Sequence, residues 1–172
     1  FRSRPGFAAT YHAGLVNDLF KEKGKIEKMP LISAERKGYV TVTFRDSIRN
    51  KWRDSNRKEW DKFIDWMERK GEEVILIEDG DSYGYNIDLK RRWTLYSNAK
   101  MNFGVNGGTI GICHYSDAPY MTFKCWTSGQ EGAELEHHQK KGGFPKGSQF
   151  LFKHDRQELF YEDDNLENLT RA

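Results

Sequence analysis

The fold is decided by residues 39–80, which run YVTVTFRDSIRNKWRDSNRKEWDKFIDWMERKGEEVILIEDG. The stretch opens on β-branched and aromatic residues at 39–44, which are typical of a buried strand. From 56 to 70 the large apolar residues recur at helical spacing, and a glycine follows that pattern. Apolar residues then run without a break at 74–77, as expected where helices cover both faces of a parallel sheet. We therefore predict a unit of strand, helix and strand.

The next part of the chain continues this alternation. We expect a helix over 88–100, a strand over 101–105, a short helix over 110–116 and a strand over 119–125. Right-handed crossovers place a helix between successive parallel strands. The predicted fold class is therefore α/β: a three-layer Rossmann-like domain with a mostly parallel, doubly wound sheet. This domain would span residues 39–172, after an N-terminal helix or linker segment over 1–38.

The ends of several elements carry cap and edge signals. Asp54 or Ser55 is expected to cap the helix over 56–70, and Asp163 or Asp164 a final helix that extends to the end of the sequence. Two short edge strands are expected at 149–154 and 158–161, and residues 127–148 are predicted to form a long surface loop. We give that loop no function.

Composition limits the classes of partner. The chain has 28 basic and 26 acidic residues, and a net charge of +2 creates no field strong enough to require nucleic acid or an anionic membrane. No apolar run is long enough to cross a bilayer, so we expect a soluble cytoplasmic protein that can work at the inner face of a membrane. The sequence begins at Phe1 rather than at a methionine, which suggests a fragment.

The candidate binding residues follow from the predicted sheet. In open α/β sheets, ligands bind beyond the carboxyl ends of the strands, so the residues that follow each strand are the candidates. These are Arg45, Arg53, Asp79, Asn106, Gly107, Gly108, Thr109 and, beyond the short helix, Asp117. No residue stands out as catalytic, because the sequence contains no nucleophile elbow, no P-loop and no ordered Ser, His and Asp set.

Phosphate binding is the favoured interpretation of the glycine pair and Arg45. Glycines let the backbone approach a ligand, and a helix that begins after Thr109 would present amide hydrogens; the alternative is a tight turn without a ligand. Arg45 could bind a diphosphate in a bidentate way, whereas Arg53 could equally belong to a solvated basic loop. Asp79 could accept from a ribose hydroxyl, although plain turn chemistry is slightly favoured for it.

The histidines and cysteines give weaker signals. His114 and Asp117 could act as acid or base near a substrate, but a packed, hydrogen-bonded His114 is equally consistent with the sequence. A metal site at His137 and His138 is not favoured, because adjacent residues rarely share a metal. The two cysteines lack the CxxC spacing of a zinc or redox site and are expected to be buried thiols.

The order of several motifs is similar to a known family. VTVTFR (40–45), RDSN (53–56), VILIED (74–79), MNFGVNGG (101–108) and SDAPY (116–120) together resemble the C-terminal, nucleotide-sugar-binding domain of a GT-B fold glycosyltransferase. The resemblance implies that Arg45 and the turn at 106–108 meet the diphosphate of the donor. It implies no metal and no cofactor, because arginines and backbone dipoles stabilise the departing diphosphate.

The function that this resemblance implies is metal-independent transfer of a sugar from a nucleotide diphosphate sugar to a glycan or lipid-linked acceptor. The family has two Rossmann-like domains, so a second domain or a partner subunit is expected. The alternatives are a non-catalytic nucleotide- or glycan-binding module and a GT-B-like epimerase or hydrolase that acts on a nucleotide sugar. A dinucleotide oxidoreductase is disfavoured, since no GxGxxG turn follows the first strand.

Overall fold

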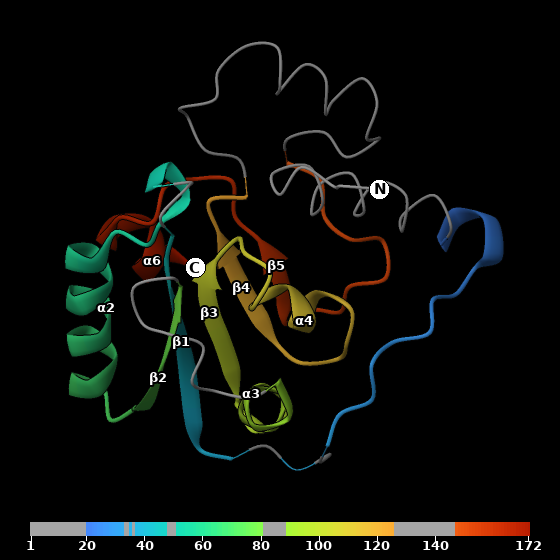
Figure 1. Cartoon of the computed structure of the whole chain (residues 1–172), viewed down its shortest axis with the longest axis horizontal. Helices are drawn as coiled ribbons and strands as arrows, with labels where there is room; N and C mark the ends of the chain where they lie inside the picture. Colours follow the sequence, from blue (N-terminus) through green and yellow to red (C-terminus); the bar gives the residue numbers. More distant parts are fainter. Residues whose placement is uncertain (1–19, 33–34, 36, 48–50, 81–88, 126–146) are drawn as a thin grey trace.

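One parallel sheet organises the molecule (Figure 1). The computed structural model describes residues 20–32, 35, 37–47, 51–80, 89–125 and 147–172. Within them the strands are β1 (Tyr39–Asp46), β2 (Glu73–Gly80), β3 (Met101–Val105), β4 (Tyr120–Phe123) and β5 (Gln157–Leu159). Their order across the sheet is β2-β1-β3-β4-β5, and every neighbouring pair is parallel.

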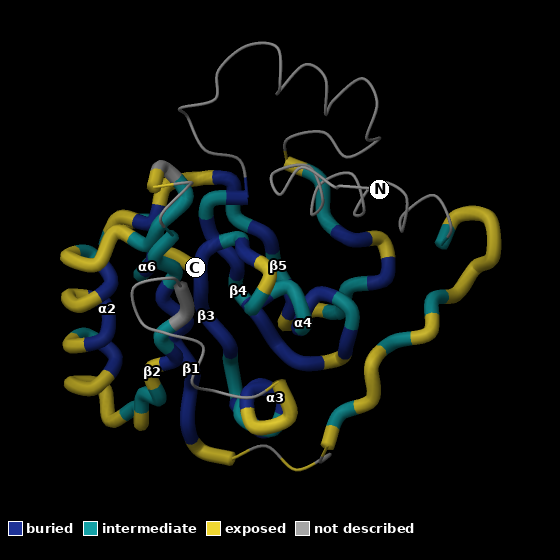
Figure 2. Tube along the Cα trace, viewed as in Figure 1, coloured by how far each residue is buried: buried dark blue, intermediate teal, exposed yellow. Residues whose placement is uncertain are grey.

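Helices cover both faces of this sheet. They are α2 (Arg57–Arg69), α3 (Leu89–Asn98), α4 (Gly111–His114) and α6 (Leu166–Arg171), with a 3-10 turn η1 (Lys51–Arg53). One core cluster joins α2 and α6 to the sheet, and a second joins α3 and α4 to the opposite face (Figures 1 and 2). The predicted three-layer, doubly wound α/β fold is therefore confirmed. The predicted division at residue 38 stays a prediction.

The strand order locates a crevice. From β1 the chain crosses to its neighbour β2 on one side, whereas β3, β4 and β5 follow on the other side. The connection that leaves β1 and the connection that leaves β3 therefore run to opposite sides of the sheet. The place between β1 and β3 is the topological switch point of a 2-1-3-4-5 sheet. Arg45 and Asp46 are the last residues of β1, and Asn106 to Thr109 follow the carboxyl end of β3. The fold thus places the predicted candidates Arg45 and Asn106 to Thr109 at the same edge of the sheet.

Helix α2 shows how the sequence pattern becomes packing. Trp60, Phe63, Ile64 and Met67 are buried, as their spacing predicts, and Gly71 adopts a φ of +85° just beyond the helix. The predicted cap is wrong, because the helix begins after Asn56. Asp54 and Ser55 bond back to the end of β1 instead, as described below.

Two further expectations are corrected. Residues 149–154 form turns rather than a strand, so β5 is the only strand of that region that the structure describes. Helix α6 is capped by Asn165, whose side chain accepts from the amide of Asn168 at 2.9 Å. The predicted cap, Asp164, is drawn instead into the buried network around α2.

The segment before β1 packs along the α3 and α4 side of the sheet. Met29 forms a bridge with Ser116, and the indole of Trp93 donates to the carbonyl oxygen of Pro30 at 3.2 Å. Phe20 contacts Phe152, with ring centroids 5.9 Å apart. Much of the N-terminal helix or linker segment expected over 1–38, and the loop expected at 127–148 except for its end, lie outside the described residues.

Candidate functional site

Arg45 lies at the switch point with its guanidinium beside the turn that follows β3. A Cβ placed at Gly107 would lie 3.5 Å from Nη1 of Arg45. The Arg45 side chain is only 19% exposed, and its Nε is buried without a hydrogen-bond partner among the described residues. The nearest ionic contact is with Oδ1 of Asp54 at 3.8 Å, which is too long for a hydrogen bond. Arg45 is therefore largely desolvated and incompletely neutralised.

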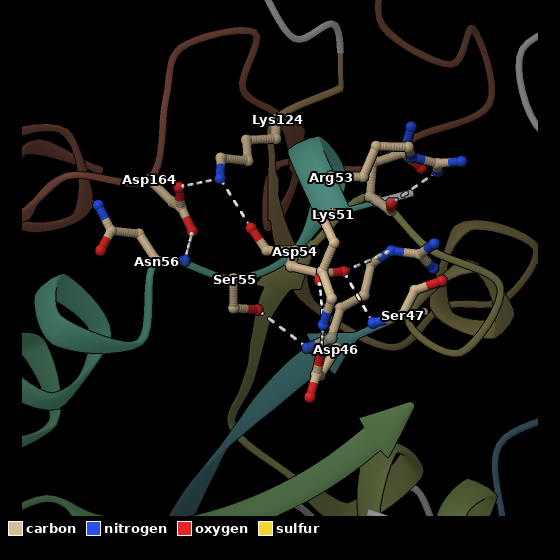
Figure 3. A network of polar contacts seen from close by, with 11 residues as sticks. Asp46, Ser47, Lys51, Arg53, Asp54, Ser55, Asn56, Lys124 and Asp164 are labelled. Atoms are coloured by element: carbon tan, nitrogen blue, oxygen red, sulfur yellow. Dashed lines mark hydrogen bonds and ion pairs between the residues drawn. The ribbon is translucent and has the colours of Figure 1, made fainter. Parts of the chain in front are cut away.

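Arg53 reaches the same turn from the other side. Its Nη2 donates to the carbonyl oxygen of Asn106 at 2.8 Å (Figure 3). Burial, and after it the positive charge of Arg45, lower the pKa of Arg53 to about 10, while Asp54 opposes the shift. The two guanidiniums are thus close enough to repel each other. Their shared neighbourhood favours an anion.

The loop that carries Arg53 is held against the end of β1. Ser55 Oγ accepts from the amide of Arg45 at 2.9 Å, and Asp54 Oδ1 accepts from the amide of Ser47 at 2.9 Å (Figure 3). Because these side chains are used here, they are not available to cap α2. Burial is the main cause that raises the pKa of Asp54, and the charge of Lys51 opposes it.

The charges of this loop nearly cancel, but not fully. Lys51 pairs with Asp46 at 2.5 Å and with Asp54 at 3.6 Å. Among the described side chains of the loop and its strand end, three cations (Arg45, Lys51 and Arg53) therefore face two carboxylates (Asp46 and Asp54). This end of the sheet therefore carries more basic than acidic side chains among those named here.

The turn after β3 is accessible, but it is not a helix-dipole site. A Cβ at Gly108 would meet no atom within 4 Å, and Gly108 is exposed. The helix expected to begin directly after Thr109 begins one residue later: α4 starts after Ile110 and has no side-chain cap. Helix α4 has four residues, so its aligned peptide dipoles are few. Any anion here would be held chiefly by the arginines.

Asn106 has a structural task in this turn. Its amide donates to the carbonyl oxygen of Phe123 at 2.8 Å, and its side-chain Nδ2 donates to the carbonyl oxygen of Cys125 at 3.5 Å. These bonds tie the turn to β4. Asn106 therefore presents its carbonyl oxygen to Arg53, while its side chain is directed at β4.

Two other predicted residues have different surroundings. Asp79 stands opposite Arg45 in the register of β1 and β2, as the convergence of strand ends predicts. Asp117 lies at the other edge of the sheet, where the chain returns from α4 to the start of β4, and it pairs with Lys28 at 2.6 Å. The structure therefore does not bring Asp117 to the arginines. A helix between parallel strands must run back to the amino edge, which explains this placement.

His114 is a packed residue of the core. Its Nε2 lies 3.0 Å from Oγ1 of Thr122, and its ring contacts those of Tyr120 and Phe150. Burial lowers the pKa of His114 to about 4. Of the two alternatives left open for His114, the geometry matches the packed one.

Lys124 is an important residue that the sequence analysis missed. It adopts a φ of +51°, and its Nζ contacts both Oδ1 of Asp164 at 2.7 Å and the carbonyl oxygen of Asp54 at 2.8 Å (Figure 3). Asp164 also accepts from the indole of Trp60 and from the amide of Asn56, each at 2.7 Å. This network fixes the loop of Arg53 and occupies the start of α2 with a carboxylate from the chain itself.

No family model matches the chain, and no curated protein matches it. In fold it is similar to three mutant forms of a flavo di-iron protein from Thermotoga maritima. Two of them share 13% identity at a TM-score of 0.44, covering 79% and 80% of this chain and 35% and 34% of theirs. The third shares 14% at a TM-score of 0.41, covering 79% and 35%. This chain therefore spans about a third of their length.

These comparisons correct the family prediction. The resemblance to a GT-B glycosyltransferase is wrong, because the similar solved structures are flavo di-iron proteins. The prediction of sugar transfer is wrong for the same reason, and the module, epimerase and hydrolase alternatives gain no support. The expectation of no cofactor is contradicted as well. With identities of 13–14% and TM-scores below 0.5, however, the likeness assigns neither flavin nor iron to this chain. The predicted second domain or partner subunit stays a prediction.

The described residues contain neither a candidate metal centre nor a candidate membrane span. In the described ranges, no group of three or more His, Cys, Asp and Glu side chains is arranged to hold a metal ion, so these residues do not fit a di-iron centre. His137 and His138 lie outside those ranges. No helix in the described part of the chain is long and apolar enough to cross a bilayer.

Proposed function

We propose that the protein binds a small phosphate-bearing molecule at the switch point, with Arg45 and Arg53 as its main contacts. The observation that carries the proposal is the partial desolvation of Arg45, whose buried Nε has no hydrogen-bond partner among the described residues. A phosphate oxygen would supply the missing acceptor. It would also offset the repulsion by Arg45, which adds to burial in lowering the pKa of Arg53.

The shape of the turn supports a phosphate rather than a larger protein surface. Gly107 has no side chain to separate Arg45 from the backbone, and Gly108 leaves open space beside it. Thr109 follows and can add a hydroxyl donor. Two planar guanidiniums next to an exposed backbone turn match the several oxygens of a phosphate or diphosphate better than the two oxygens of a carboxylate.

The test is binding of pyrophosphate, measured by calorimetry and by thermal unfolding. A ligand that binds only the folded protein should add about 2.7 kcal/mol of stability at a hundred times its dissociation constant. We expect Arg45→Met to remove most of this stabilisation. Arg69→Gln is the matched control, because Arg69 is exposed at the end of α2 and bonds only to the carbonyl oxygen of Asp65 among the described groups.

Acetate at the same ionic strength separates phosphate recognition from a general salt effect. Stabilisation by acetate equal to that by pyrophosphate would contradict the proposal, and so would an undiminished pyrophosphate effect in Arg45→Met.

A further inference from the structure

A cavity of about 400 Å³ opens at the opposite edge of the sheet from the arginine pair. It lies between α2, α6 and the amino ends of β1, β3 and β4. Its volume falls within the range of roughly 300–1,000 Å³ that is usual for small-molecule sites. Val40, which lines it, precedes Arg45 by five residues in one strand, a separation of about 17 Å. The cavity is therefore a separate place in the fold.

The walls of the cavity are apolar and adaptable. Its apolar lining includes Phe63, Trp66, Met67, Phe103, Met121 and Leu169. The ring of Phe63 stacks on Trp66 with centroids 5.7 Å apart and meets Phe103 edge-on at 5.3 Å. Methionine side chains are unbranched and polarizable, so they can adjust to the shape of a flexible apolar group. This lining suits a hydrocarbon body better than a sugar or a base, which need several hydrogen-bonding groups.

The rim carries excess positive charge. Three basic residues line the cavity, Lys70, Lys100 and Arg156, against one acidic residue, Glu72. Lys100 forms an ion pair with Glu72, and Arg156 donates to the carbonyl oxygen of Lys100. The ammonium of Lys70 lies over the ring of Trp66, 3.7 Å from its centroid. In the part of the chain that the structure describes, neither Lys70 nor Arg156 forms an ion pair with a carboxylate.

The geometry points to a second binding site, for an amphipathic carboxylate such as a medium-chain fatty acid. Its hydrocarbon tail fills the cavity between α2, α6 and the sheet, and its carboxylate lies at the rim with Arg156 and Lys70. Burial of the tail provides most of the affinity, at about 0.8 kcal/mol for each buried methylene. The two cations orient the ligand, because a neutral tail of the same length would leave them without a counter-ion.

The experiment compares decanoate with 1-decanol, each below its aggregation concentration, by calorimetry on the full chain. We expect decanoate to bind with one equivalent and decanol to bind at least about tenfold more weakly, which corresponds to about 1.4 kcal/mol. Arg156→Gln should weaken decanoate at least about tenfold, and its exposed position leaves the fold intact. Arg69→Gln, which removes a surface arginine that does not line the cavity, should leave the affinity unchanged.

A second variant tests the cavity itself. Met121→Trp places a larger side chain in the cavity and should abolish decanoate binding while the far-ultraviolet circular dichroism stays unchanged; if that variant unfolds, Thr170→Phe on α6 replaces it. Equal affinities for decanoate and decanol would overturn the inference. Full decanoate affinity in both Arg156→Gln and the variant that fills the cavity (Met121→Trp or Thr170→Phe) would overturn it as well. Loss of decanoate binding in Arg45→Met would also overturn it, since it would place the ligand at the arginine pair. Pyrophosphate binding is independent of every one of these outcomes.

Discussion

Arg53 donates a hydrogen bond from Nη2 to the carbonyl oxygen of Asn106 at 2.8 Å, and so joins the loop after β1 to the turn after β3. These residues are 53 positions apart in the sequence. The bond fixes both sides of the switch point relative to each other. The side chain of Arg45, by contrast, has one long ionic contact among the described residues, with Asp54 at 3.8 Å. The two arginines therefore differ in what they contribute to the folded state.

Removing each arginine should separate stability from binding. Arg53→Met loses a charged hydrogen bond in a buried setting, and we expect its free energy of unfolding to fall by about 1.5–3 kcal/mol. Arg45→Met keeps an apolar stem beside Gly107 and loses only a long ion pair, so its free energy of unfolding should fall by less than about 1 kcal/mol. Urea unfolding measures both values. Equal losses in the two variants would contradict this division of tasks.

The buried carboxylate of Asp164 should be one of the most sensitive positions in the chain. It is 1% exposed and is shared by Lys124, Trp60 and the amide of Asn56. Asp164→Asn leaves the Lys124 ammonium, only 12% exposed, without its counter-ion, and we expect a loss of about 3–5 kcal/mol in urea unfolding.

Two variants control this prediction. Asp163→Asn removes a neighbouring exposed carboxylate and should change stability by less than about 0.5 kcal/mol. Lys124→Met in the Asp164→Asn background removes the uncompensated charge and should restore part of the loss. A double variant that is less stable than Asp164→Asn alone would show that the ion pair is not the cause.

The helices and strands could be predicted from the sequence, whereas the buried network of Lys124 and Asp164 could not. The core side of α2 follows from apolar residues at helical spacing, a local pattern that packing then reinforces. Arg45 can be predicted because it ends a recognisable strand. Lys124 and Asp164 cannot be predicted in this way. They are 40 positions apart in the sequence, Trp60 is farther still from Asp164, and no local pattern indicates such distant pairs.

Competition between local hydrogen bonds explains why the predicted cap of α2 is wrong. Ser55 is a good helix cap by residue type, yet its hydroxyl accepts from the amide of Arg45, so α2 starts one residue later.

The position of Asp117 depends on how the strands are ordered in the sheet. The sequence shows only that Asp117 follows a short helix. The strand order, which decides where each connection returns, cannot be obtained from periodicity alone. The family resemblance failed because short motifs in a plausible order do not specify an activity.

His114 should make the protein less stable in mild acid. Its pKa of about 4 in the folded state lies below the value near 6.5 of an exposed histidine, so the unfolded state binds the extra proton first. Its contribution is complete above about pH 6.5 and is lost as the pH falls toward 4, by roughly 3 kcal/mol in total.

Unfolding free energies of the wild type and His114→Phe, measured from pH 7 to pH 4, check this expectation. The variant keeps an aromatic ring against Tyr120 and Phe150 but cannot titrate, so the stability difference between the two proteins should shrink or reverse as the pH falls. Parallel profiles for the wild type and His114→Phe would show that another group controls the acid response.

A side chain at Gly104 should be poorly tolerated, although this glycine lies in the middle of a strand. A Cβ there would lie 3.2 Å from the carbonyl oxygen of Thr43 and 3.3 Å from the Cβ of Thr43, so the backbones of β1 and β3 would have to shift slightly apart. We expect Gly104→Ala to lower the free energy of unfolding by about 1–3 kcal/mol. Gly108→Ala is the matched control in the same region: its Cβ meets no atom within 4 Å, and its stability should stay within about 0.5 kcal/mol of wild type.

Gly104→Ala should also weaken pyrophosphate binding, because β1 ends near Arg45 and Asn106 follows β3. A destabilised Gly104→Ala variant that binds pyrophosphate with full affinity would show that the spacing of β1 and β3 does not position the two arginines.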